Sequence, residues 1–128
     1  MMLMTKEWVQ KAEGDYGVVS LLVKSRKAWR YDGICFHAQQ CAEKYLKARL
    51  TEASIVFPKT HDIPDLLQMV LPVEPTWFVL IPEAKTLNRW SVQPRYPGNS
   101  PAPAEAREAV KAARKFRAAG RKAFGLAL

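Results

Sequence analysis

The chain has 128 residues, of which 48% are hydrophobic, and its excess of Lys and Arg gives it a net charge of +8. This size and composition suit one core, so we expect a single domain spanning residues 1–128. No run approaches the roughly 18 apolar residues of a membrane span, and the Met-rich opening segment is too short for a signal peptide. The sequence therefore predicts a cytoplasmic protein without membrane contact.

Two long segments near the N-terminus carry apolar residues at every third or fourth position, which is typical of amphipathic helices. The first predicted helix covers residues 5–27, with Thr5 as its N-cap because a threonine hydroxyl can accept from a first-turn amide. The second covers residues 32–53. The link at residues 29–33 is too short for a crossover, which favours an antiparallel hairpin.

Prolines divide the middle of the chain. A shorter helix begins at Thr60 or Asp62, either of which can cap it, and the prolines at 72 and 75 end it. A further helix covers residues 77–90, and Pro82 either opens or kinks it because proline lacks a backbone donor.

The C-terminal third combines a long loop with a long helix. Residues 91–103 contain four prolines and a glycine, and loops of this length are often functional or partly disordered. The last helix covers residues 103–124, with small apolar residues on one face. The sequence thus predicts an all-α fold, an up-and-down antiparallel helical bundle with four to five helices.

The opposite face of the last helix is basic, and two interpretations of it stay open. It can follow a polyanion, or it can be a solvated surface that keeps the helix soluble. The residues on this face are Arg107, Lys111, Arg114, Lys115, Arg121 and Lys122.

The two cysteines and two histidines indicate neither a disulfide nor a metal site. Cys35 and Cys41 stand six positions apart in one predicted helix, so their Cα atoms should be about 9 Å apart. A disulfide needs less than about 7 Å, so we expect two buried thiols. His37 and His61 lie in different segments without zinc-ligand spacing, and no cofactor is expected.

Three local motifs combine into a recognisable pattern. They are FHAQQCAEKYLKA at residues 36–48, PKTHD at 58–62 and RYP at 95–97. In this order and spacing the chain resembles the HEPN family over nearly its whole length. The resemblance implies a helical bundle that dimerises, often beside a small nucleotidyltransferase partner. Many members of that family are RNA-cutting toxins, in which an Arg followed a few residues later by a His supplies an active site shared across the dimer.

This chain departs from the nuclease pattern. No His follows Arg95, and the nearest arginines before the two histidines, His37 and His61, are Arg30 and Arg49. Metal-independent RNA cleavage needs a proton-transfer group that works near neutral pH, together with a cation at the phosphate. We therefore expect no nuclease activity.

A ligand cleft can still be predicted from residue types. Gln39, Glu43 and Lys47 share one helical face and can contact a base, ribose or phosphate. The alternative is a Glu43–Lys47 surface pair that contributes about 0.3 to 0.5 kcal/mol. His61 either caps or packs a helix end, donating to a backbone carbonyl, or closes the cleft. The predicted cleft comprises Gln39, Glu43, Lys47, His61, Arg95 and Tyr96.

The proline-rich loop supplies the last two of these residues. Arg95 and Tyr96 pair a guanidinium with an aromatic ring, which suits phosphate contact and base stacking. Alternatively, Tyr96 anchors the loop on the bundle while Arg95 reaches a carboxylate such as Glu43.

Three functions therefore stay open, and we favour the first. It is a homodimeric HEPN-like module that binds nucleotide or RNA beside a nucleotidyltransferase partner, without nuclease activity. The second is an RNA-cleaving toxin of a toxin-antitoxin pair, with a non-standard site in which His61 and Arg95 converge. The third is a purely structural assembly partner. The chain has four tryptophans, and we do not expect so small a domain to bury all of them fully, which supports dimerisation.

Overall fold

A computed structural model describes residues 1–91, 97–98 and 100–128, and in these ranges the protein has helices and no strands. Within these ranges, five α-helices and one 3₁₀ helix follow one another. This confirms the predicted all-α bundle. The elements are α1 (Leu3–Val23), α2 (Arg30–Glu52), α3 (Ile63–Val70), η1 (Pro75–Leu80), α4 (Ile81–Asn88) and α5 (Pro103–Ala123).

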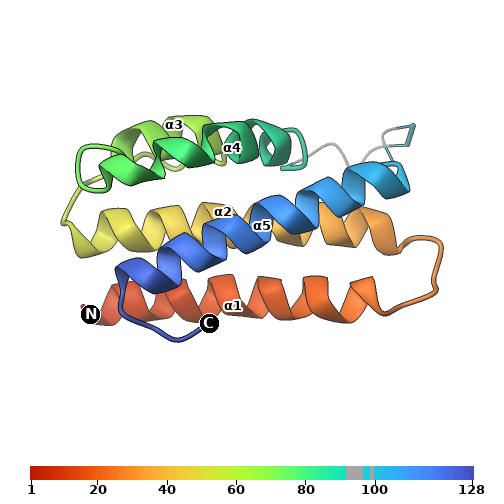
Figure 1. The fold of residues 1–128 in the computed structure, drawn as a ribbon, viewed down its shortest axis with the longest axis horizontal. Coiled ribbons are helices and arrows are strands. Elements are labelled where there is room, and N and C mark those ends of the chain that lie inside the picture. Colours follow the sequence, from red (N-terminus) through yellow and green to blue (C-terminus); the bar gives the residue numbers. More distant parts are fainter. Residues whose placement is uncertain (92–96, 99) are drawn as a thin grey trace.

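The central helix of the bundle is α2, which packs against α1, α3, α4 and α5. Figure 1 shows α1 on one side of the α2 and α5 pair, with α3 and α4 on the other. Helices α1 and α2 run antiparallel, as the sequence predicts. None of the helices in the described part of the chain is both long and apolar enough to span a bilayer.

Two predicted helix starts and one predicted helix end are wrong at the N-terminal hairpin. Thr5 is not an N-cap, because α1 begins at Leu3 and the Thr5 hydroxyl instead donates to Glu52 Oε1 at 2.9 Å. The link is residues 24–29, because α1 ends at Val23 rather than near residue 27 and α2 begins at Arg30 rather than near residue 32. At the starts of both α1 and α2, the helix extends further toward the N-terminus than the apolar periodicity does.

The later helices agree with the sequence in their caps and prolines, but the single helix predicted for residues 77–90 is wrong, because the structure divides this stretch into η1 and the shorter α4. The Asp62 side chain accepts from the Asp65 amide at 2.9 Å and caps α3. Pro82 opens α4, where its missing amide proton is of no consequence in the first turn. Helix α5 covers almost the range predicted for it.

The hydrophobic core lies between α2 and the helices that pack against it. Leu46 and Phe116 are fully buried in it, and so are Trp90 and the thiols of Cys35 and Cys41. Both cysteines are free, as expected, and burial raises the pKa of Cys35 to about 12. Of the four tryptophans, two are buried, whereas Trp29 is 63% exposed.

Candidate functional site

Three polar side chains project from one face of α2 and form a buried ladder. Gln39 Nε2 donates to Glu43 Oε1 at 3.1 Å, and Lys47 Nζ donates to Glu43 Oε2 at 3.1 Å. The side chains of Glu43 and Lys47 are only 4% and 8% exposed. The surface pair considered above is therefore wrong, and this ion pair belongs to the interior, where each charge depends on the other.

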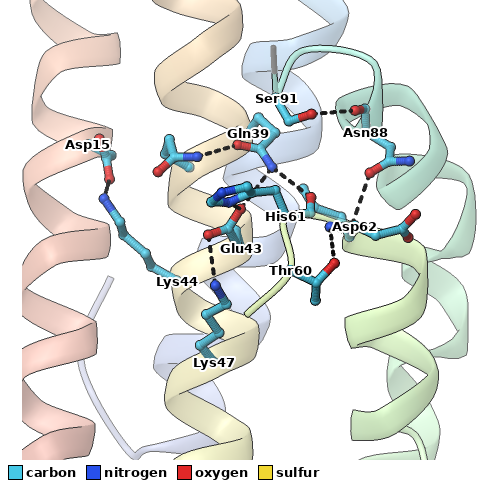
Figure 2. Close-up of polar contacts among 12 residues, drawn as sticks. Asp15, Gln39, Glu43, Lys44, Lys47, Thr60, His61, Asp62, Asn88 and Ser91 are labelled. Atoms are coloured by element: carbon cyan, nitrogen blue, oxygen red, sulfur yellow. Dashed lines mark hydrogen bonds and ion pairs between the residues drawn. The ribbon is translucent and has the colours of Figure 1, made fainter. Parts of the chain in front are cut away.

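His61 reaches this ladder from the segment between α2 and α3. Its Nδ1 lies 2.9 Å from Glu43 Oε1, and its backbone carbonyl accepts from Gln39 Nε2 at 3.1 Å. The predicted bond from the His61 ring to a backbone carbonyl is thus replaced by a bond to a carboxylate. Figure 2 shows Gln39, Glu43 and Lys47 in line along α2 with His61 beside Glu43, so four predicted site residues do come together.

The position of His61 is fixed by its neighbours in the chain. Thr60 Oγ1 accepts from the Asp62 amide at 3.1 Å, and Asn88 Oδ1 in α4 accepts from the Ile63 amide at 3.0 Å. With Asp62 also capping α3, the turn is held from both sides. The imidazole is therefore placed by local hydrogen bonds before any ligand binds.

This arrangement fixes the tautomer of His61. An ionised carboxylate can only accept hydrogen bonds, so the proton between His61 and Glu43 belongs to Nδ1. The other ring nitrogen, Nε2, has no hydrogen-bond partner in the described part of the chain, and the His61 side chain is 66% exposed. Nε2 is then free to accept a proton when neutral or to donate to an anion when the ring is charged.

Aromatic rings cover the other end of the ladder. The Lys47 ammonium lies 5.6 Å from the ring centroid of Trp8 in α1 and 5.9 Å from that of Phe57. The two rings are tilted against each other with centroids 6.4 Å apart. These contacts explain how an ammonium group is tolerated with so little solvent around it.

A second histidine–carboxylate pair joins α1 to α2, and sequence analysis missed it. Asp15 Oδ1 lies 2.7 Å from His37 Nδ1, and Asp15 Oδ2 accepts from Lys44 Nζ at 2.6 Å. The one signal in the sequence was the placement of Asp15 on the apolar stripe of α1, between Ala12 and Val19. His37 is half-buried.

A third polar cluster ties α1 to α5 and to α2. Glu13 accepts a two-pronged contact from Arg117, with Nε to Oε2 at 2.9 Å and Nη2 to Oε1 at 2.9 Å. Tyr45 donates to the same carboxylate at 2.5 Å, and Arg121 lies 3.4 Å away. Burial raises the pKa of Glu13, but these hydrogen bonds outweigh it, so the pKa lies below its ordinary value.

Other predicted site features fall outside these clusters. Arg95 and Tyr96 lie outside the described residues, so their place relative to His61 stays a prediction. No group of His, Cys, Asp and Glu that could hold a metal occurs within residues 1–91, 97–98 and 100–128.

Comparisons with known proteins find similarity to a family model, to a relative and to a solved structure. A family model for the HEPN domain matches residues 5–123. The protein named "Putative toxin MJ1304" from Methanocaldococcus jannaschii is 32% identical over 99 residues, which are 72% of this chain and 62% of that relative. The chain thus spans less than two thirds of that relative's length. The crystal structure of TT1696 from Thermus thermophilus is similar with a TM-score of 0.76 and 28% identity, covering 94% of this chain and 98% of that chain.

Proposed function

The chain belongs to the HEPN family, and from this membership we propose that it is a nucleotide- or RNA-associated binding module that acts with a small nucleotidyltransferase partner. The observation that carries the ligand proposal is the contact between His61 and Glu43. A buried carboxylate holds an exposed imidazole by Nδ1 and directs Nε2 outward. Such an arrangement suits recognition of a phosphate oxygen or the edge of a base.

The ligand site follows from the same residues. Glu43 and Lys47 satisfy each other inside the bundle, so their role is to place His61 rather than to touch the ligand. The exposed ring supplies the contact, and Arg95 and Tyr96 would add a guanidinium and a stacking ring from the proline-rich loop.

Calorimetric titration with ATP and GTP tests this proposal. We expect binding heat with the native chain and at least about tenfold weaker affinity in His61→Ala, because that variant lacks one charge-assisted hydrogen bond. Lys59→Ala is the matched control, because Lys59 is an exposed cation two positions away with no ion-pair partner in the described residues. Equal losses in both variants would contradict a specific role for His61.

We also propose that the module is a homodimer. Exposed large apolar side chains support this, since they leave apolar surface that a second copy can cover. They include Leu3, Leu21, Val56, Phe78 and Val79. Sedimentation equilibrium at micromolar concentration tests the dimer. Co-expression with a small nucleotidyltransferase encoded beside this gene tests the proposed partner. If that protein does not co-purify with this chain, the partner proposal is wrong.

A second function, an RNA-cleaving toxin with a non-standard site, is favoured by two observations. One relative carries a name that includes the word toxin, and His61 has the orienting carboxylate that a general base needs. His37 requires the same test, because it stands seven positions after Arg30 and therefore two turns along the same face of α2. Total RNA incubated with the native chain, His61→Ala and His37→Ala would show whether RNA is cut and which histidine is required.

The third function, a purely structural assembly partner, would be supported by a different pair of results. Calorimetry would show no heat with either nucleotides or RNA, while the product of the neighbouring gene would still co-purify. The binding-module proposal predicts heat in the first of these experiments.

A further inference from the structure

Unpaired cations gather at one end of the bundle. Figure 1 shows the α1–α2 loop beside the beginning of α5, at the end of the molecule away from the C-terminus. Across the described residues, none of these cations forms an ion pair, unlike those of the clusters around Glu13 and Glu43. They are Lys24, Arg26, Lys27, Arg30, Arg107 and Arg114.

Several of these side chains surround a cavity. The hollow has a volume of about 370 Å³ and lies between the end of α1, the start of α2 and the first half of α5. No carboxylate occurs among its described lining residues. An adjoining hollow of about 190 Å³ adds Lys24 and shares Arg114. We call the two together the basic groove, whose cationic lining comprises Lys24, Arg30, Arg107, Lys111 and Arg114.

The cations of α5 are spaced along one wall of the groove. Arg107, Lys111 and Arg114 stand at i, i+4 and i+7, so they share a face and cover about 10 Å of the helix axis. Lys111 has one weak exposed contact, 3.7 Å from Glu108, and neither arginine has a partner in the described residues. Three neighbouring cations with so little compensation repel one another, and an anion in the groove would relieve that repulsion.

The opposite wall combines a cation, Arg30, with the ring of Tyr31, and Trp29 is their neighbour in the chain outside the lining residues. The Arg30 guanidinium stacks 4.2 Å from the Tyr31 ring centroid and donates to the Lys27 carbonyl at 2.7 Å, so it is held in place. Trp29, directly before it, is 63% exposed. Basic side chains beside exposed aromatic rings are the combination that binds unpaired bases together with their phosphates.

We propose that the basic groove binds single-stranded nucleic acid, with phosphates on Arg107, Lys111 and Arg114 and an unstacked base against Trp29. The groove shares no residue with the His61 site, so this is a second binding surface, independent of the function proposed above. A continuous strand fits better than a single nucleotide because the cations extend along the helix rather than around one point.

Fluorescence anisotropy with labelled single-stranded RNA and DNA oligonucleotides of one sequence tests the proposal. The triple variant R107Q/K111Q/R114Q should bind at least tenfold more weakly, and the slope of log affinity against log salt should fall by about 2, which is about 0.7 for each phosphate that is no longer neutralised. The matched control is K6Q/K85Q/K122Q, which removes the same charge from exposed lysines outside the groove. If the control weakens binding as much, general positive charge explains binding and the groove proposal is wrong.

Three further measurements separate this surface from its alternatives. Trp29→Ala should weaken binding about tenfold because the base then has no ring to stack on, and duplex RNA should bind less tightly than a single strand. Duplex binding of equal strength, with no effect of Trp29→Ala, would overturn the proposal. His61→Ala should leave this binding intact; if it abolishes binding while the triple variant does not, RNA binds at His61, which supports the proposed function and rejects the groove.

Discussion

Oε1 of Glu43 lies 2.9 Å from Nδ1 of His61, yet the two side chains are 4% and 66% exposed. One contact thus joins the interior of the bundle to its surface. Substitution of Glu43 should mainly lower stability, because the buried end of the contact supports the fold. Substitution of His61 should mainly affect ligand binding, because the exposed end is available to a ligand.

Glu43→Gln should destabilise the fold by about 3 kcal/mol, because it leaves the buried Lys47 ammonium without its counter-charge. The double variant Glu43→Gln/Lys47→Met should recover most of that loss, since it removes the uncompensated charge as well. Urea unfolding followed by circular dichroism measures both. Glu108→Gln is the control, because its exposed pair with Lys111 should change the free energy of unfolding by less than about 0.5 kcal/mol. A double variant no more stable than the single one would contradict this account.

His61→Ala should lower the free energy of unfolding by less than about 1 kcal/mol, because the ring is mostly exposed and buries little surface. The Gln39 and Lys47 bonds to Glu43 remain in that variant. Thermal unfolding of His61→Ala beside Glu43→Gln measures the contrast. A His61 variant as unstable as the Glu43 variant would show that His61 is a structural residue.

Apolar periodicity was enough to predict the helices, because α2 and α5 each bury a continuous stripe of small and aliphatic residues. It could not predict that Glu43 is buried, because the residue is covered by the segment that returns along α2 to place His61. It also gave Thr5 the wrong role, since the partner of that hydroxyl, Glu52, is distant in sequence. Where a polar side chain found a local partner, as at Asp62, the prediction was correct.

Acid should weaken the contact between α1 and α5 through Glu13. Its pKa in the folded chain lies below the ordinary 4.5, so its stabilising effect is complete above that pH and is lost as the pH falls through the lowered value. Glu13→Gln should therefore be about 1 to 2 kcal/mol less stable than the native chain at pH 7, a difference that narrows below pH 4.5.

Urea unfolding at a series of pH values between 7 and 3 measures the difference in the free energy of unfolding between the native chain and Glu13→Gln. Glu7→Gln provides the control, because Glu7 is an exposed carboxylate of the same helix with no ion-pair partner in the described residues. A constant difference between the native chain and Glu13→Gln across this range would exclude the ionised carboxylate as the source of the stability.

Helix α5 lies close against Tyr45 of α2 at Gly120, and a methyl group there should be costly. A Cβ at this position would lie 2.3 Å from Cδ1 of Tyr45, a fully buried ring that also donates to Glu13. Gly120→Ala should therefore destabilise the chain by about 1 to 3 kcal/mol through overpacking. Gly17→Ala is the matched control, since a Cβ there meets no atom within 4 Å, and it should stabilise α1 by about 0.5 to 1 kcal/mol. Thermal unfolding of the two variants should thus shift in opposite directions, and a stabilised Gly120→Ala would show that α2 and α5 are not held together as closely as the Tyr45 contact requires.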